Sequence, residues 1–348
     1  MHPDYYSPSA DRIPNAPPLI APVTGPGPRP LWSVMIPTYN CLAYLREALE
    51  SVLEQDPGPE HMQIEVVDDA STDGDVAGLV RAVGRGRVGY FRQPANRGSL
   101  RNFETCLNRA RGEWVHLLHG DDRVMAGFYT EIDMLLRRYP EAGAAFTNVI
   151  HIETGGMDLF VSDPLLPKPG LLPYFLCQLA QGQTIQPPSI VVKRTVYEQL
   201  GGFFAVHYGE DWEMWTRIAA HFPIAYSPRC LAHYRYLNSA SITLRSLATG
   251  QNIKDIATVI DIIQDYLPAA ERPRIRRIAR QHYAEYCVAL AHSLYETNPP
   301  AAFVQAHGAL GMSASTGVLY MALKLYVKDL IRYKELKKLW RKTAVSEA

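Results

Sequence analysis

Short apolar runs alternate with amphipathic stretches along the first half of the chain. Strands are predicted at Leu31–Ile36, Ile64–Val67, Val88–Arg92, Trp114–Leu118 and Gly143–Ile152. Apolar residues at helical spacing follow several of these runs; the first such set is Leu42, Leu45, Leu49 and Val52, with Asn40 placed to cap the helix. Strands that alternate with helices predict an α/β fold with a largely parallel sheet.

The pattern changes at both ends of the chain. Residues 1–30 are dense in proline and poor in large apolar side chains, which predicts a disordered leader. From residue 246 the apolar spacing is helical, so a helical C-terminal subdomain (246–348) is expected after a main domain at 31–245. The stretch from Lys324 to Lys342 combines basic residues with apolar ones at helical spacing. It can lie on an anionic membrane surface or pack as a terminal helix with a solvated basic face.

Composition excludes some classes of function. The 348 residues carry 35 basic and 35 acidic side chains, and a net charge of zero gives no reason to expect nucleic-acid binding. The five cysteines form no C-x-x-C pair, which favours a reducing, cytoplasmic compartment. We expect neither a signal peptide nor a membrane-spanning helix, because no apolar run is long enough.

Acidic residues recur at the ends of predicted strands. Asp68-Asp69 and Asp121-Asp122 each follow an apolar run, and Glu210-Asp211 opens an amphipathic helix. In parallel α/β sheets ligands bind where the carboxyl ends of the strands meet. The sequence therefore predicts a ligand site at this edge of the sheet.

Five segments in a fixed order resemble one known family. They are SVMIPTYN (33–40), EVVDDASTDG (65–74), the Asn96-Arg97-Gly98 loop leading to Arg101-Asn102, GEWVHLLHGDD (112–122) and GEDWEMWTRIA (209–219). Together they are similar to family 2 glycosyltransferases with the GT-A fold, over roughly residues 31–245. The resemblance implies a Rossmann-like mixed, largely parallel sheet flanked by helices. It also implies an inverting enzyme that uses a nucleotide sugar.

The resemblance implies a nucleotide-sugar site. Pro37, Tyr39, Asp68 and Asp69 match positions that surround the base in similar enzymes, and Arg101 falls where such enzymes place a basic residue near the nucleotide. His119 and Asp121 are expected to contact the donor as well. A UDP-sugar is the first candidate donor. The alternative for Asp68 and Asp69 is that each is a turn former or cap.

The resemblance also implies a metal site. Asp121 and Asp122 stand at the family's D-x-D motif, and carboxylates with substrate phosphates are the ligands that Mn²⁺ or Mg²⁺ takes. His233 is a further expected ligand. Similar enzymes bring a late histidine or arginine to the metal or the diphosphate, so Arg235 is an alternative to it. The other interpretation is that His233 is a structural histidine. His119 replaces the first Asp of the fuller motif, and can contact the donor or pack at the strand end.

Asp211 matches the general base of the family. It would take the proton of the acceptor hydroxyl while the oxygen attacks the anomeric carbon. The alternative is that Glu210 and Asp211 only favour the helix N-terminus. Glu210 and Trp212 are expected to contact the acceptor, Trp212 by stacking on a sugar ring, whereas Trp215 is expected in the core.

Other functions are weaker fits. A sugar nucleotidyltransferase would carry a Gly-rich phosphate loop, and none follows Ile36. A non-catalytic nucleotide-sugar-binding or membrane-associated scaffold protein is favoured by His119 and the basic tail. It is disfavoured by the retention of Asp121, Asp122 and Asp211. The acceptor is expected to be a glycan or a lipid-linked glycan of the cell envelope, reached at the cytoplasmic face of the membrane, although no residue encodes it.

Overall fold

The computed structural model describes residues 12–24, 28–236 and 242–331. The chain divides into two compact units. The first comprises Met1–Leu179 and Gln183–Ser241, and the second comprises Ala180–Gly182 and Ile242–Ala348. The division predicted after residue 245 lies four residues further along the chain.

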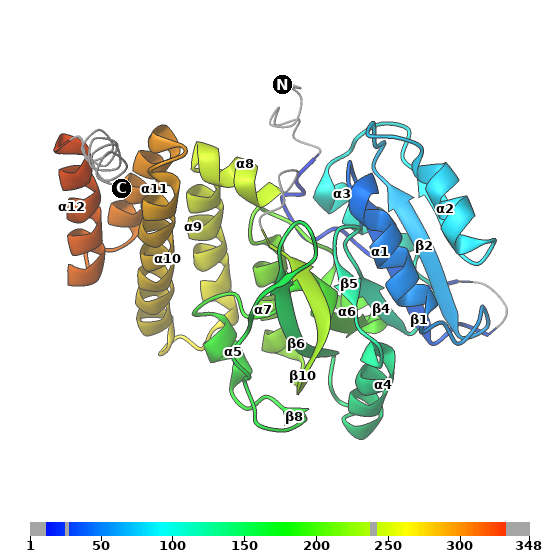
Figure 1. Ribbon diagram of the computed structural model, residues 1–348. Helices are drawn as coiled ribbons and strands as arrows, with labels where there is room; N and C mark the ends of the chain where they lie inside the picture. Colours follow the sequence, from blue (N-terminus) through cyan, green and yellow to red (C-terminus); the bar gives the residue numbers. More distant parts are fainter. Residues whose placement is uncertain (1–11, 25–27, 237–241, 332–348) are drawn as a thin grey trace. The chain divides into compact units, whose positions relative to one another are not determined.

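The first unit is built on one mixed sheet. Its strands are β1 (Trp32–Thr38), β2 (Met62–Asp68), β3 (Gly89–Arg92), β4 (Trp114–Leu117), β5 (Arg123–Val124), β6 (Ala144–Ile152), β7 (Asp158–Val161), β8 (Gly170–Leu171), β9 (Ile190–Lys193) and β10 (Ile224–Arg235). The order is β3-β2-β1-β4-β9-β6-β10-β5, with β7 beside β6 and β8 beside β10. Figure 1 shows β6 and β10 side by side in this sheet.

Six of the ten strands run in the same direction: β1, β2, β3, β4, β6 and β10. β1 pairs in parallel with both β2 and β4, and β10 pairs in parallel with β6. β9 is antiparallel to β4 and β6, so β6 and β10 run in the same direction as β1. The carboxyl ends of β1, β2 and β4 therefore meet at one edge. This confirms the predicted fold class and the convergence of the first two acidic clusters.

Helices cover both faces of the sheet. The helical segments of this unit are α1 (Leu42–Leu53), α2 (Val76–Gly84), α3 (Ser99–Arg109), α4 (Phe128–Arg138), α5 (Phe175–Leu179), η2 (Pro187–Ser189), α6 (Arg194–Leu200) and α7 (Glu210–His221). Alternate residues of β1, such as Val34 and Ile36, join one core cluster with apolar residues of α1, α2 and α4. Met35 between them is also buried but faces the other way, the side on which α3 contacts β1.

The proline-rich segment is ordered where the structure describes it, which corrects the prediction of a disordered leader for residues 12–24 and 28–30. Ile20 is buried, at 2% exposure. The backbone carbonyl oxygens of Pro14 and Pro18 accept hydrogen bonds from Ala205 and Gly202. Prolines lack an amide proton but keep a carbonyl, so a proline-rich segment can still pack and accept hydrogen bonds. Residues 1–11 and 25–27 lie outside the described residues.

The second unit is helical, as predicted. It contains α8 (Ile242–Thr249), α9 (Gln251–Ile263), η3 (Gln264–Tyr266), α10 (Arg272–Leu294), α11 (Pro299–Met312) and α12 (Thr316–Leu330). α10 packs against α9, α11 and α12 (Figure 1). Asn252 and Gln305 exchange hydrogen bonds of 2.9 and 3.1 Å in its interior. Within the described ranges, none of the helices combines the length and the apolarity needed to cross a bilayer.

Candidate active site

The ends of β1 and β2 are tied together by side-chain hydrogen bonds. Asn40 has a left-handed backbone (φ 49°), and its side-chain oxygen accepts from the amide of Thr72 at 2.7 Å. The first amide of α1, that of Leu42, donates instead to Asp73 at 2.8 Å. Asn40 is therefore not the cap that the sequence predicted. The carboxylate that serves α1 comes from the loop after β2.

The carboxylate of Asp68 is hydrogen-bonded within the protein. Asp68 is fully buried, and its carboxylate accepts from the Tyr90 hydroxyl at 2.8 Å, from the amide of Ser71 at 2.9 Å and from Arg92. Donors from β3 and from the β2 loop thus surround both of its oxygens. This arrangement fits the turn-forming alternative rather than direct contact with a nucleotide.

Asp69 organises the loop that leads into α3. Its carboxylate accepts from the amides of Arg97 at 2.7 Å and Gly98 at 2.9 Å, and from the Asn96 side chain at 2.9 Å. Gly98 has φ +89°, a conformation that L side chains rarely adopt. Burial raises the pKa of Asp69 to about 6, although the two amides oppose the shift.

Three other predicted nucleotide contacts lie along or beside these strand ends. Pro37 is buried in β1, and Tyr39 is half-buried immediately after that strand. Arg101 lies in the first turn of α3, where its guanidinium forms an ion pair with Glu104 at 2.7 Å. The structure thus gathers Pro37, Tyr39 and Asp69 around the ends of β1 and β2. Arg101 lies on α3, the helix that follows the 96–98 loop held by Asp69.

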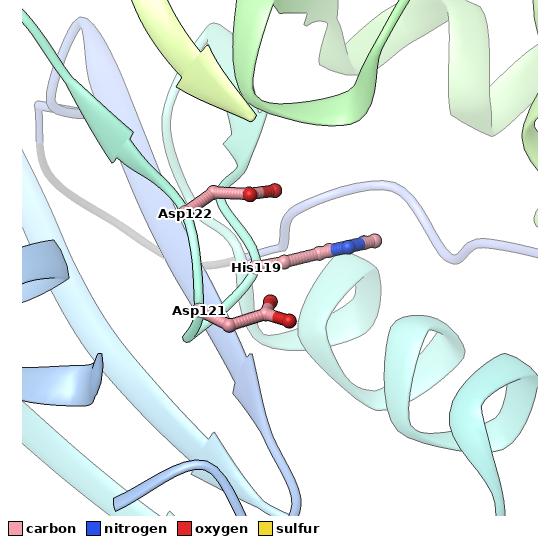
Figure 2. A group of neighbouring side chains, drawn as sticks. All are labelled: His119, Asp121 and Asp122. Carbon is pink, nitrogen blue, oxygen red and sulfur yellow. The ribbon is translucent and has the colours of Figure 1, made fainter. Parts of the chain in front are cut away.

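The turn after β4 carries a potential metal site. His119, Asp121 and Asp122 each offer a ligand atom, and these atoms all lie within 4.8 Å of one another. Figure 2 shows the three side chains leaving one turn toward the same side. Gly120 lets this turn pass close to the end of β1, because a Cβ there would lie 3.0 Å from the Thr38 hydroxyl and 2.8 Å from the Cys41 sulfur.

Asp122 has an unsatisfied oxygen. The side chain is 2% exposed, and its Oδ1 accepts from the amide of Arg235 at 2.8 Å. Its Oδ2 is buried and has no hydrogen-bond partner among the described residues. Burial and the neighbouring Asp121 raise the pKa of Asp122 well above its ordinary value. A cation bound at this oxygen would remove the cost of burying it unpaired.

His119 packs against an aromatic ring. Its imidazole stacks on Phe103 of α3, with centroids 5.3 Å apart and planes inclined by 15°. Burial lowers the pKa of His119, which favours the neutral ring that has a free lone pair. The ring contacts continue from Phe103 to Phe203 at 5.3 Å and from Phe203 to Trp215 of α7 at 5.8 Å. One row of rings thus connects the turn after β4 with the helix that carries Asp211.

His233 does not belong to this cluster, contrary to the prediction for a metal ligand. Its Nδ1 accepts from Arg123 at 3.1 Å, and its Nε2 lies 3.7 Å from a carboxylate oxygen of Asp158. The ring is therefore held by side chains of β5 and β7. Arg235, its alternative, does reach the turn, but its guanidinium is occupied by protein acceptors, among them the backbone oxygen of Asp121 at 2.8 Å.

The start of α7 holds another carboxylate of the predicted site, the half-buried Asp211. Asp211 accepts from the Gln183 side chain at 2.7 Å and from the amide of Trp212 at 2.7 Å. Burial raises its pKa to about 6, and both hydrogen bonds oppose that rise. Glu210 beside it is half-buried. Sequence reasoning missed Gln183, because nothing in its surroundings distinguishes it from the other polar residues of that loop.

Trp212 lies in the core, which corrects the prediction that it stacks on an acceptor sugar. Its side chain is 1% exposed, and its indole N–H donates to the backbone oxygen of Leu179 at 2.7 Å. Trp212 is one step past Asp211 on a helix, so it points about 100° away from it. Trp215 is buried as predicted.

Comparison with known proteins identifies the family. Residues 33–199 match the sequence profile described as Glycosyl transferase family 2. A β-1,3-glucosyltransferase of Campylobacter jejuni, named for the acceptor GalNAc(5)-diNAcBac-PP-undecaprenol, is 27% identical over 221 residues. This match covers 62% of this chain and 68% of that enzyme. The chain belongs to glycosyltransferase family 2. This glycosyltransferase also matches an uncharacterized protein of Mycobacterium tuberculosis, MT1568, with 30% identity over 65% of this chain and 73% of the relative.

Two solved structures share the fold of this glycosyltransferase. Staphylococcus aureus TarS 1–349 in complex with UDP-GlcNAc aligns with a TM-score of 0.61 and 14% identity, covering 90% of this chain and 92% of TarS. The mannosyltransferase PcManGT of Pyrobaculum calidifontis, in complex with GDP-Man and Mn²⁺, aligns with a TM-score of 0.56 and 21% identity, covering 91% and 90%. The fold is therefore GT-A. The family match ends at residue 199, so the role of Asp211 has to be argued from its surroundings.

Proposed function

We propose that this glycosyltransferase moves a sugar from a nucleoside-diphosphate sugar to a hydroxyl group, with inversion and with help from Mn²⁺ or Mg²⁺. The observation that carries the proposal is Asp122, which has a buried oxygen without a partner among the described residues and offers a ligand atom within 4.8 Å of ligand atoms on Asp121 and His119. The solved relatives support the donor class, since TarS was crystallised with UDP-GlcNAc and PcManGT with GDP-Man. A UDP-sugar is the donor to test first.

The donor set suits a hard divalent cation. Two carboxylates supply oxygen, and Mn²⁺ also accepts an imidazole nitrogen such as that of His119. When bound, such an ion neutralises negative charge on the departing nucleoside diphosphate. Asp122 is already oriented by the amide of Arg235, so the turn does not need to rearrange to present its second oxygen.

The nucleotide is assigned to the ends of β1 and β2. Asp69 shapes this site by holding the 96–98 loop, and Pro37 and Tyr39 form its neighbouring wall at the end of β1. Each carboxylate oxygen can accept two hydrogen bonds, and Oδ1 of Asp69 accepts one from the protein. Asp69 therefore keeps capacity for one donor group on a base.

Asp211 is assigned as the general base. A carboxylate with a pKa of about 6 is largely ionised at pH 7, yet it is basic enough to take a proton from a hydroxyl group as that oxygen attacks. The oxygen forms its bond to the anomeric carbon while the bond to the diphosphate breaks, so the protein forms no covalent intermediate. Gln183 donates to one oxygen of Asp211 and orients it. Glu210 remains the proposed contact for the acceptor.

The acceptor is proposed to be a glycan or a lipid-linked glycan at a membrane surface. The Campylobacter relative is named for an undecaprenyl-linked acceptor. α12 buries Val318, Ala322 and Leu325 but exposes a second apolar stripe: Leu319, Tyr320, Leu323, Val327 and Leu330. In sequence, the predicted basic segment continues through 332–342, which lies outside the described residues. An apolar helix face beside basic residues fits an anionic bilayer.

Thermal shifts with UDP, GDP, CDP, ADP and dTDP, each with Mn²⁺, Mg²⁺ or EDTA, test the donor site. Ligand at about 100 times its dissociation constant should add about 2.7 kcal/mol to stability. One nucleotide should raise the melting temperature only with metal. Asp122→Asn should abolish that difference, whereas Asp211→Asn should preserve it and lose transfer. Equal loss of nucleotide affinity in both variants would contradict the two assigned roles.

Vesicle sedimentation tests the membrane surface. The full chain should bind vesicles that contain phosphatidylglycerol, should bind pure phosphatidylcholine poorly, and should be released by salt. Leu323→Glu should reduce the bound fraction, because it places a charge in the exposed stripe of α12. Leu19→Glu is the matched control, since Leu19 is also exposed but lies in the other unit. Equal binding of all three proteins would refute this part of the proposal.

A further inference from the structure

Arg235 is an arginine buried behind the metal turn. It ends β10, its side chain is 1% exposed, and its contacts link segments that are far apart in sequence. Its own amide donates to Oδ1 of Asp122 at 2.8 Å, and its Nε donates to the backbone oxygen of Asp121 at 2.8 Å. Arg235 therefore holds both aspartates of the turn. Its backbone amide binds the side chain of Asp122, and its guanidinium binds the backbone of Asp121.

The rest of the guanidinium is also occupied. Nη1 donates to the backbone oxygens of Glu153 at 3.0 Å and Thr154 at 2.7 Å, in the turn between β6 and β7. Nη2 donates to Glu47 of α1 at 2.9 Å, and the guanidinium carbon lies 4.5 Å from the centre of the Tyr44 ring. Only the planar guanidinium group can donate hydrogen bonds in all these directions at once, so a lysine cannot replace Arg235.

Glu47 completes the arrangement from the other side. Its Oε2 accepts from Arg235 and also from Arg123 at 2.8 Å, and Arg123 directly follows Asp122 in the chain. The carboxylate of α1 thus holds the turn at Arg123, and it holds the arginine that fixes Asp121 and Asp122. Arg123 also donates to the backbone oxygen of Gly156 at 3.2 Å, so both arginines secure the β6–β7 turn.

We propose that Arg235 and Glu47 are positioning residues that hold the Asp121-Asp122 turn in the conformation that binds the metal. The inference rests on the proposed function, because it assumes that the turn binds a divalent ion. Neither side chain need touch the ion. Their contribution is to remove the freedom of the turn before binding, and residues in such supporting roles typically change metal affinity by about 10–100-fold when altered.

The test is the affinity for Mn²⁺ in the presence of UDP and, separately, GDP, followed by the electron paramagnetic resonance signal of free Mn²⁺. Arg235→Lys keeps the charge but loses the fork, and should weaken Mn²⁺ binding by roughly 10–100-fold. Glu47→Gln keeps the shape and one acceptor oxygen, and should weaken it by about tenfold, the lower end of that range. Raising Mn²⁺ should restore turnover in both variants, since only the metal-binding step is affected.

Arg229→Lys is the matched control. Arg229 also lies on β10 and also pairs with a glutamate, Glu131 at 2.8 Å, but its hydrogen bonds and ion pair among the described residues do not reach the Asp121-Asp122 turn. This variant should bind Mn²⁺ like the wild type. Asp122→Asn shows whether the measured Mn²⁺ is bound at this turn, because this variant should abolish binding there.

The outcomes separate the two proposals. A wild-type chain that binds no Mn²⁺ with either nucleotide would overturn both the metal-assisted function and the positioning role. Normal Mn²⁺ affinity in Arg235→Lys and Glu47→Gln, beside loss in Asp122→Asn, would overturn the positioning role alone. If Arg235→Lys fails to fold, Glu47→Gln decides, since its side chain is 38% exposed and its loss leaves no deep cavity.

Discussion

The raised pKa of Asp211 predicts how the rate of transfer depends on pH. Burial raises this pKa from an ordinary 3.8 to about 6, and the base must be ionised to accept a proton. Because the ionised form is the active one, activity should rise with pH through that value. An exposed aspartate would give no change over the same range.

The magnitude follows from the titration. With a pKa of about 6, the ionised fraction is about 9% at pH 5 and about 91% at pH 7, so the rate should fall about tenfold between pH 7 and pH 5. With a pKa of 3.8, the ionised fraction at pH 5 would be about 94%, and the rate would hardly change. Gln183→Leu removes a hydrogen bond that opposes the rise. That variant should move the acidic limb to higher pH.

The assay measures release of the nucleoside diphosphate at saturating donor and metal, with the donor chosen by the thermal-shift screen. Nucleotide and metal binding are measured at each pH, so that loss of binding is not mistaken for loss of the base. Gln281→Leu, at an exposed position of α10, is the control for Gln183→Leu. A flat profile from pH 5 to 7 with binding intact, or an active Asp211→Asn variant, would refute the assignment of Asp211.

Three further predictions follow from the contacts. Without metal, Asp122→Asn should raise the melting temperature, because it removes a carboxyl group whose ionised form is costly to bury beside Asp121; a decrease would show that the unpaired oxygen is not costly. Ile20→Ala should lower the free energy of unfolding in urea by about 2–3 kcal/mol, whereas Leu19→Ala, 89% exposed, should leave it nearly unchanged. Asp68→Ala should cost about 1–3 kcal/mol of stability by leaving buried donors unpaired, measured in the same urea titration; a loss of nucleotide affinity without loss of stability would instead make Asp68 a ligand contact.

The sequence predicts the parallel half of the sheet well, because buried strands there are short apolar runs with clear turns between them. β10 is not predicted, and its composition explains why. It contains Pro228 and the charged Arg229 and Arg235, and its pairing with β6 shifts register twice. An irregular strand of this kind has neither an apolar run nor a strict alternation.

The sequence predicts the site residues whose position depends on the order of strands and helices. It does not predict those whose role depends on tertiary packing. The strand-end positions of Asp69, Asp121 and Asp122 follow from the alternation of strands and helices. The burial of Trp212 does not, since it depends on which face of α7 meets the core. Neither do the roles of Gln183 and Glu47, because single polar residues far from any motif become relevant only when tertiary contacts bring them to a carboxylate or an arginine.

The packing of the N-terminal segment has a consequence for biosynthesis. Pro14 accepts a hydrogen bond from Ala205, which follows it by 191 residues. At ribosomal rates of about 5–20 residues per second, the first of these residues is made roughly 10–40 s before the second. During that interval Ile20 has no partner from residue 202 to cover it. The contact between this apolar side chain and residue 202 therefore forms only after most of the first unit has been translated.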